Sequence, residues 1–393
     1  AVGVVAVDDL DASVRALTVG GYDPYRDPAG DNPLAETRTV APTGTRSADA
    51  PAIDAKDIAR VLGWDAPRLD PAGLLASGEA IPVRCSHSAA LAHERGFDAM
   101  FDATREVIAA ADVAVVPWEP ALNEGDVTPC ERSFHLVASP ATAAAAADAG
   151  FDVALAAGNH VGDCVETAEA CDQGAAVLAT LEHLRAAGLL VAGAGADLDE
   201  ARAPAVLTAD GVTFAFLAYD DIAREFLGAT ADLPGTAPLD LATLAVDVAA
   251  AKARADHVVV GFSWGVEYTS APTARQREAA GVAVAAGASL VVGNHPHWVQ
   301  ATERIGDAFV AYGLGNFVFD QDGFEERTQG AVLEAGFTRE RLLGVRLRPT
   351  AIRERHRPEF VVPHSGESRA ILGRIWDATD ALPPRESLPE AKD

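Results

Sequence analysis

Residues 289–297 read SLVVGNHPH, a short apolar run that leads directly into polar groups. Residues 289–292 have the length and composition of a buried strand. Glycine and proline mark a turn after the run, and the turn carries the imidazoles of His295 and His297. Two neutral imidazoles that follow a strand can point into one cleft and offer nitrogen ligands to a divalent ion. The stretch therefore predicts a strand that ends at a polar site.

Apolar strand-like runs alternate with helical runs along most of the chain. Strands are expected at residues 80–85, 113–117, 153–157, 189–192, 213–219, 257–263, 289–292, 308–312 and 331–337. Helices are expected at residues 97–110, 141–149, 174–187 and 274–286. A further strand at residues 2–7 and a short helix at residues 54–62 precede them. The alternation predicts a layered α/β domain.

Polar residues gather where these predicted strands end. They are Glu119, Asn159 with His160, Asp220, residues 263–267 and residues 294–297. Because ligand sites in open α/β sheets lie at the carboxyl ends of strands, the pattern predicts one shared site. The structural alternatives are that the histidines are core residues or capping residues, and that a buried Glu119 pairs with an arginine.

Gly158-Asn159-His160, followed by Asp163, forms a second motif at a strand end. In a metal-dependent phosphoesterase site the asparagine oxygen ligates a metal and the histidine acts as a general acid. Asp163 would brace His160 and fix its tautomer. The Gly-Asn-His triplet alone is weak evidence for such a site. Its occurrence in one chain ahead of the motif with His295 and His297 is stronger evidence.

These motifs resemble the CapA proteins of poly-γ-glutamate capsule synthesis. Five ordered blocks carry the resemblance: residues 158–163, residues 194–204 (AGADLDEARAP), residues 264–268 (WGVEY), residues 293–300 and residues 312–321 (YGLGNFVFDQ). The resemblance implies a calcineurin-like metallophosphoesterase fold, a four-layer α/β/β/α sandwich with a short N-terminal extension. The expected domains are residues 1–75 (extension and linker), 76–366 (CapA-like domain) and 367–393 (C-terminal tail).

The resemblance also implies a set of site residues. Metal ligands would be Glu119, Asn159, His295 and His297, and catalytic residues would be His160, Asp163 and Glu267. Glu267 could instead cap the following helix.

Two departures from the family pattern weaken the expected metal site. Family members usually carry Gly-Asp after the first strand, whereas residues 80–87 read AIPVRCSH, so the first acidic ligand is expected to be missing, with His87 as a weak substitute. Ser263 stands where a histidine is usual. We therefore expect a single divalent ion (Mn, Fe or Zn) or none.

Charge and hydropathy exclude several classes of partner. The formal net charge of −27 repels phosphate backbones, so nucleic acid is excluded as a partner, and any anionic substrate must be received locally by a metal or an arginine. No apolar stretch approaches the roughly 20 residues of a membrane span. The chain begins at Ala1 without a basic and apolar leader, so it is expected to be either a mature secreted form or a trimmed chain. The resemblance to the CapA proteins implies an extracytoplasmic location, with the signal peptide removed.

The sequence has four cysteines: Cys85, Cys130, Cys164 and Cys171. They include no CxxC pair, so the sequence does not support a zinc ribbon or a thioredoxin-like site. Two disulfides are possible in an oxidising compartment, and the short loop between Cys164 and Cys171 is the better candidate bridge. Four free cysteines remain the alternative.

The leading functional hypothesis is a CapA-type hydrolase or transferase that acts on an anionic cell-surface polymer such as a γ-glutamyl chain. The alternatives are a non-catalytic protein that binds or anchors the capsule polymer, and a phosphoesterase that acts on a phosphate-containing small molecule.

Overall fold

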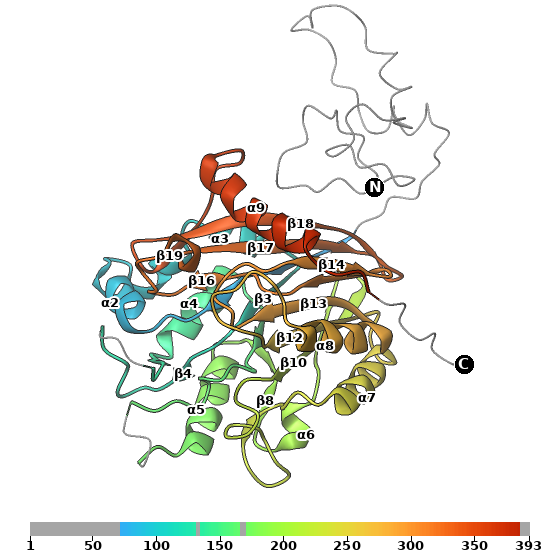
Figure 1. Cartoon of the computed structure of the whole chain (residues 1–393). Coiled ribbons are helices and arrows are strands. Elements are labelled where there is room, and N and C mark those ends of the chain that lie inside the picture. Colours follow the sequence, from blue (N-terminus) through green and yellow to red (C-terminus); the bar gives the residue numbers. More distant parts are fainter. Residues whose placement is uncertain (1–70, 131–133, 166–169, 386–393) are drawn as a thin grey trace, which may run out of the picture. The chain divides into compact units, whose positions relative to one another are not determined.

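The computed structural model describes residues 71–130, 134–165 and 170–385. Two mixed β-sheets form the centre of this part of the chain (Figure 1). The seven-stranded sheet has the order β19-β18-β17-β1-β3-β6-β7 and the six-stranded sheet the order β14-β15-β13-β12-β10-β9. The strand expected at residues 2–7 and the helix expected at residues 54–62 lie outside the described residues.

The seven-stranded sheet has a parallel half and an antiparallel half. Its parallel strands are β1 (Ala72–Ala76), β3 (Val113–Pro117), β6 (Val153–Leu155) and β7 (Leu190–Ala192). The antiparallel strands are β17 (Gln329–Phe337), β18 (Leu342–Arg353) and β19 (Arg357–Phe360). All five residues of β3 are buried, as expected for a central parallel strand covered on both faces.

The six-stranded sheet is parallel at its centre and antiparallel at both edges. Its parallel strands are β10 (Val212–Asp220), β12 (His257–Ser263), β13 (Ala288–Asn294) and β15 (Ala308–Ala311). The edge strands are β9 (Ala205–Ala209) and β14 (Thr302–Ile305). Parallel central strands place their carboxyl ends along one edge of the sheet, where a shared site can form.

The two sheets pack face to face, and small residues allow their close approach. A Cβ added to Gly261 of β12 would lie 2.7 Å from Leu155 Cδ1 of β6. The rings of Phe214 on β10 and Phe337 on β17 meet edge to face with centroids 5.2 Å apart. This apolar contact closes the layer between the sheets.

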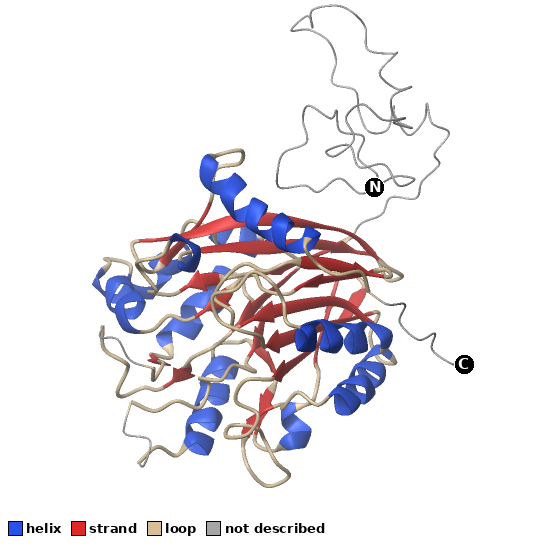
Figure 2. Cartoon of the chain, in the orientation of Figure 1, coloured by secondary structure: helices blue, strands red, loops and turns tan. Residues whose placement is uncertain are grey.

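Helices cover the outer faces of both sheets (Figure 2). One hydrophobic cluster joins the seven-stranded sheet to α2 (Arg84–Ala92), η3 (Gly96–Phe101), α3 (Arg105–Ala109), α4 (Ala141–Ala149) and α5 (Gln173–Ala186). A second cluster joins the six-stranded sheet to α6 (Leu198–Ala201), α7 (Leu241–Lys252) and α8 (Ala274–Ala285). The expected α/β/β/α layering is confirmed.

Three short strand pairs and a turn shape the edge where the strands end. They are β2 (Glu79–Ala80) with β16 (Asn316–Val318), β4 (Ala121–Leu122) with β5 (Val137–Ala138), β8 (Ala194–Gly195) with β11 (Gly235–Thr236), and the 3₁₀ turn η4 (Glu325–Arg327).

Two expected elements near the start of the domain are wrong. Residues 80–85 are not a strand, because β2 ends at Ala80 and α2 begins at Arg84; the first strand of the sheet is β1, which the sequence analysis missed. The helix expected at residues 97–110 is split into η3 and α3, with the Thr104 hydroxyl donating to the Phe101 carbonyl at the break.

The observed elements cross both of the expected domain bounds. β1 spans the bound at residue 75, and α9 (Gly366–Asp380) occupies much of the expected tail. The apolar face of α9 is buried through Ile371, Leu372 and Ile375. Within the described residues, no helix combines the length and the apolar character that a membrane span requires.

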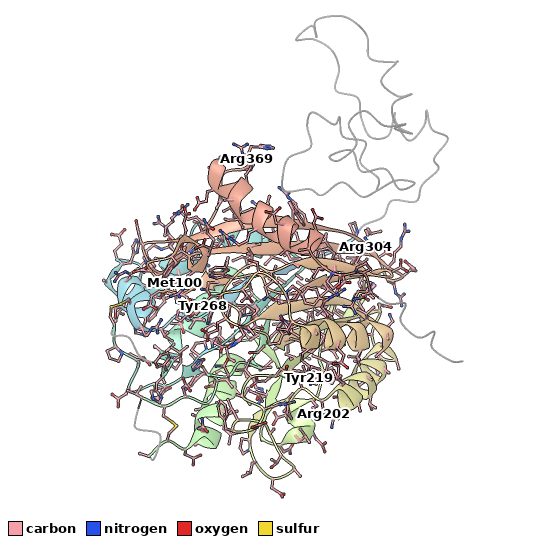
Figure 3. All side chains as sticks on the ribbon, in the orientation of Figure 1. Met100, Arg202, Tyr219, Tyr268, Arg304 and Arg369 are labelled. Carbon is pink, nitrogen blue, oxygen red and sulfur yellow. A yellow bond between two sulfur atoms is a disulfide. The ribbon has the colours of Figure 1, made fainter. Side chains whose placement is uncertain are left out.

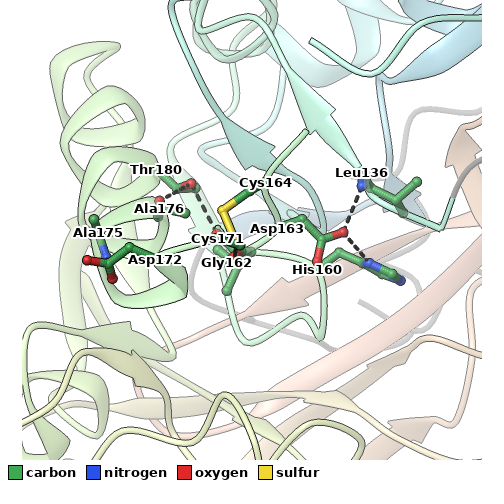
Figure 4. Close-up of a disulfide and its surroundings, with 11 residues drawn as sticks. Leu136, His160, Gly162, Asp163, Cys164, Cys171, Asp172, Ala175, Ala176 and Thr180 are labelled. Carbon is green, nitrogen blue, oxygen red and sulfur yellow. Dashed lines mark hydrogen bonds and ion pairs between the residues drawn. A yellow bond between two sulfur atoms is a disulfide. The ribbon is translucent and has the colours of Figure 1, made fainter. Parts of the chain in front are cut away.

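Both disulfides are formed, between Cys85 and Cys130 and between Cys164 and Cys171. The bridge expected within the short loop is therefore confirmed, and the alternative of four free cysteines is wrong. The Cys164–Cys171 bridge lies beside His160 and Asp163 (Figure 4).

Candidate functional site

Side chains from strand ends of both sheets meet at one place. The seven-stranded sheet supplies Glu79 after β1, Glu119 after β3, and Asn159 with His160 after β6. The six-stranded sheet supplies Ser263 at the end of β12, and His295 and His297 after β13. The convergence predicted from the sequence is thus present, and it includes a carboxylate that the prediction lacked.

Glu79 is the residue that the sequence analysis missed. Its Oε1 accepts hydrogen bonds from Asn294 Nδ2 at 2.8 Å and from the His295 backbone N–H at 3.2 Å. Its Oε2 lies 3.0 Å from His297 Nδ1. Gly78-Glu79 follows β1 after Ser77, so the expectation that no acidic group follows the first strand is wrong: the group is a glutamate, and it precedes residues 80–87, where an aspartate was sought. The signal was the Gly-acid pair at residues 78–79.

Gly78 lets this carboxylate enter the site. A Cβ at Gly78 would lie 2.5 Å from the Gly315 carbonyl oxygen, a distance that side chains do not tolerate. The two backbone segments that meet here also pair next to this contact, because β2 and β16 form a parallel strand pair with Glu79 opposite Asn316. The glycine therefore sets how closely the Glu79 segment packs against the turn before β16.

His297 and Glu79 form a buried ion pair. Burial alone lowers the pKa of His297, but the Glu79 carboxylate and a contact of 2.9 Å from Nδ1 to Asn316 Oδ1 outweigh it, so the pKa of His297 is raised. Burial likewise raises the pKa of Glu79, and the charge and hydrogen bond of His297 outweigh it, so the pKa of Glu79 is lowered. Both shifts favour the charged forms of the two partners.

His295 is the neutral member of the histidine pair. Burial, followed by the charge of His297, lowers the pKa of His295 to about 4. Its Nδ1 lies 3.1 Å from Asn159 Oδ1, so two of the expected ligands are in direct contact. Both histidines have positive φ, 86° at His295 and 58° at His297, a conformation that costs free energy in residues other than glycine and concentrates at functional sites.

Glu119 lies completely within the protein, with 1% of its surface exposed. Burial, and then the charge of Glu79, raise the pKa of Glu119 well above its ordinary value, which favours the protonated form of this carboxyl group. A Cβ at Gly158 would lie 2.2 Å from Glu119 Oε2. The glycine of the Gly-Asn-His motif is therefore required for the loop after β6 to pass over this carboxyl group.

His160 is held by Asp163, as the sequence predicted (Figure 4). Asp163 Oδ2 lies 2.6 Å from His160 Nδ1 and also accepts the Leu136 backbone N–H at 2.7 Å. The contact fixes the Nδ1–H tautomer and leaves Nε2 free for proton transfer. His160 is a quarter exposed, so it is open to solvent on one side.

Glu267 and Tyr268 lie at the rim of the site. Glu267 is exposed, and its charge helps to raise the pKa of His297. The ring of Tyr268, which is labelled in Figure 3, stacks on the His297 ring with centroids 5.9 Å apart. Its hydroxyl accepts a hydrogen bond from Gln321 Nε2 at 3.0 Å. Glu267 thus acts on the two histidines through the electric field of its charge.

Two other candidate groups have structural partners. Asp220, at the end of β10, accepts hydrogen bonds from the Ile222 and Ala223 backbone N–H groups and the Thr236 hydroxyl. His87 packs its ring on Phe97 with centroids 4.7 Å apart, so it belongs to the packing of α2 and η3. Neither residue is required as a ligand.

Two buried oxygens of the site, Glu119 Oε2 and Ser263 Oγ, have no hydrogen-bond partner, and Glu79 Oε2 has only its ion-pair contact with His297. Unpartnered buried oxygens are costly, and a divalent cation is one group that satisfies them. As the side chains lie, no group of three or more His, Cys, Asp or Glu residues among those described is arranged to hold an ion. Once deprotonated, the carboxylates and imidazoles, with the amide oxygen of Asn159, are donor types that suit Mn, Fe or Zn.

Comparisons with known proteins agree with the motifs. Residues 73–321 match the family described as bacterial capsule synthesis protein PGA_cap. The chain is 30% identical over 242 residues to the PGA biosynthesis protein CapA of Bacillus subtilis, covering 61% of each chain. It is 33% identical over 196 residues to the capsule biosynthesis protein CapA of Bacillus anthracis, covering 49% of this chain and 46% of that one. The chain thus spans less than two thirds of either relative.

Among solved structures, the NAD nucleotidase of Haemophilus influenzae aligns at a TM-score of 0.43 with 13% identity, covering 79% of this chain and 63% of that one. A 5'-nucleotidase precursor of Thermus thermophilus aligns at 0.43 with 16% identity, covering 74% and 56%. Because the PGA_cap match covers well over half of the sequence, the chain belongs to the bacterial capsule synthesis protein family PGA_cap.

Proposed function

We propose that this chain is a metal-dependent hydrolase or transferase of capsule biosynthesis that acts outside the cytoplasm on an anionic cell-surface polymer. The observation that supports it is the buried carboxylate of Glu79, joined to His295 and His297 and next to a second buried carboxyl group with an unpartnered oxygen. The two disulfides support an oxidising compartment.

The residues present would hold one divalent ion. Glu79, Glu119, Asn159, His295 and His297 supply the donors. A bound ion would polarise the scissile carbonyl or phosphoryl oxygen. Ser263 offers a hydroxyl in place of an imidazole, which makes a second ion less well supported.

His160 would move the proton that the reaction requires. Its Nδ1 is held by Asp163 at 2.6 Å, so Nε2 would be the atom that exchanges the proton. Asp163 in turn is fixed by the Leu136 N–H, which keeps the imidazole in one orientation. Such a positioned group contributes on the order of 10²- to 10⁴-fold to a rate.

Metal binding by matched variants tests the proposal. The purified chain is loaded with Mn²⁺ and its metal content and affinity are measured by mass spectrometry and titration calorimetry. Glu119→Gln and Glu79→Gln each remove one negative ligand and should weaken the affinity roughly 10-fold or more. Glu106→Gln makes the same change at an exposed position of α3 and should bind as the wild type does.

Two results would contradict the proposal. One is a wild-type chain that takes up no metal, which would favour the non-catalytic polymer-binding alternative. The other is unchanged affinity in both variants, which would remove the ligand assignment. Release of glutamate from a γ-linked oligomer, compared with hydrolysis of an aryl phosphate, separates the polymer hydrolase from the small-molecule phosphoesterase.

A further inference from the structure

A cavity of about 570 Å³ lies next to the histidine side of the candidate site. Gln321 lines it and donates a hydrogen bond to the hydroxyl of Tyr268, whose ring stacks on His297. Asn316 makes a second link, because its Oδ1 contacts His297 Nδ1 and its Nδ2 donates to the Arg327 carbonyl at 2.8 Å. A ligand in this cavity would lie beside the paired histidines.

Three arginines line the cavity, and two of them have carboxylate partners. Arg84 Nε donates to Asp320 Oδ1 at 3.0 Å, and Arg355 Nε lies 2.6 Å from Asp322 Oδ2. Both aspartates also line the cavity, so its charged groups sum to three positive and two negative. The excess positive charge belongs to Arg327.

Arg327 has no carboxylate partner among the residues that the structure describes. Its guanidinium lies 4.0 Å above the centroid of the Tyr268 ring and 4.6 Å from that of Phe324. Its Nε is buried and makes no hydrogen bond. The two rings hold the plane of the guanidinium by cation–π contact and leave its edge donors unused.

A stacked guanidinium with unused edge donors is suited to an oxyanion. Its planar fork matches the two oxygens of a carboxylate or phosphate, and a partly desolvated charge gains more from such a partner than an exposed one. The need for such a residue follows from the net charge of −27, since the overall field repels anions. Arg327 also lies beyond residues 73–321, the part of the chain that the family match covers.

We propose that Arg327 receives the oxyanion of the ligand, a carboxylate or a phosphate, in the cavity beside His297. The assignment rests on the proposed function in so far as the ligand is the substrate of that site, but oxyanion binding by Arg327 does not require a metal. Arg327 would position the ligand, and Tyr268 and Phe324 would hold Arg327.

Titration calorimetry of the full chain with two probes tests this assignment. The probes are inorganic phosphate and a γ-linked glutamate hexamer, each titrated into the metal-free wild type and Arg327→Met. The methionine keeps the apolar stem between the two rings and removes the charge. Affinity for at least one probe should fall on the order of 10- to 100-fold, as expected for a charge-assisted contact. The probe that loses affinity identifies the oxyanion.

Two further variants control the test. Arg304→Met makes the same change at an exposed arginine of β14, well away from Tyr268 in Figure 3, and should bind as the wild type does. Arg327→Lys keeps the charge but loses the fork, so it should bind several-fold more weakly, and it serves if Arg327→Met fails to fold.

Equal affinities of wild type and Arg327→Met for both probes would overturn the assignment, as would a wild type that binds neither probe. If the metal test above fails while Arg327→Met still loses affinity, the oxyanion assignment stands and the metal-dependent proposal falls. If metal binds normally and Arg327→Met keeps its affinity for both probes, the metal-dependent proposal stands and the oxyanion assignment falls.

Discussion

Asp220 shows how a single buried carboxyl group can make the stability of this chain depend on pH. It is fully buried, and burial raises its pKa to about 6 despite hydrogen bonds from two backbone N–H groups and from Thr236. The ordinary aspartate pKa is 3.8. The folded chain therefore binds this proton more tightly than the unfolded chain does, and the stability that this proton contributes is lost as the pH rises from about 4 to about 6.

Asp220→Asn should remove that dependence. The difference in free energy of unfolding, wild type minus variant, should decrease by on the order of 3 kcal/mol between pH 4 and pH 7. Urea unfolding at each pH measures it. Asp126→Asn, at an exposed position, should give a difference that does not change with pH. If the difference between wild type and Asp220→Asn did not change with pH, the buried carboxyl group would not have the raised pKa.

Individual site residues were predictable where a clear apolar strand precedes them. His295, His297 and Asn159 follow strands rich in valine or alanine, and the structure places His295 and Asn159 in contact. Glu79 escaped because β1 (AGLLA) has no β-branched residue and is weakly marked, whereas the isoleucine and valine of residues 80–83 imitate a strand. Pro82, in the middle of that run, was the signal against it.

Other residues carry no sequence signal for their surroundings. Arg327 matters because the η4 turn brings it over Tyr268, about sixty residues earlier in the chain, and no local pattern encodes that contact. The raised pKa of Glu119 likewise depends on its burial and on the charge of Glu79, both of which the fold sets. Long-range contacts of this kind set charge and pKa, so they become visible only in three dimensions.

At the scale of elements, strands buried on both faces were the easiest to predict. β12 has the predicted bounds, His257–Ser263, since all seven of its residues are buried and its composition is rich in valine. β18 and α9 were missed. Arginines interrupt the apolar residues of β18, and only one face of α9 is buried. Neither element therefore has a continuous apolar run in the sequence.

The two disulfides connect segments of very different length, and their contributions to stability should differ accordingly. Cys85 and Cys130 are 45 residues apart, whereas Cys164 and Cys171 are 7 apart. Loop-closure entropy in the unfolded chain then gives about 4 kcal/mol for the first bridge and about 2 kcal/mol for the second. The first bridge also anchors the start of α2 next to the cavity that Arg327 lines.

Paired cysteine-to-serine variants test this difference. The variant lacking Cys85 and Cys130 should lose about twice as much free energy of unfolding as the variant lacking Cys164 and Cys171, measured by urea unfolding without reductant. The short-loop variant is the matched control, since it removes the same chemical bond. Equal losses, or a larger loss from the short loop, would show that contacts in the folded state outweigh loop entropy here.

At the scale of the whole molecule, the charge of −27 should control how fast an anionic ligand arrives. Salt shortens the range of this repulsion, from about 30 Å at 0.01 M to about 8 Å at 0.15 M. The contact between Arg327 and an oxyanion is shorter than either length, so salt screens this contact much less than it screens the approach of the ligand. Repulsion during the approach is therefore the part of the interaction that salt relieves most.

The association rate of a γ-linked glutamate oligomer should consequently rise several-fold between about 10 mM and 150 mM NaCl, as measured by stopped-flow fluorescence. Most charge-complementary pairs show the opposite trend. A lysine oligomer of the same length, which the field attracts, should associate more slowly as salt is added. If the glutamate oligomer also slowed, the positive cavity would already dominate the field along the path of approach, and the overall charge would not set the rate.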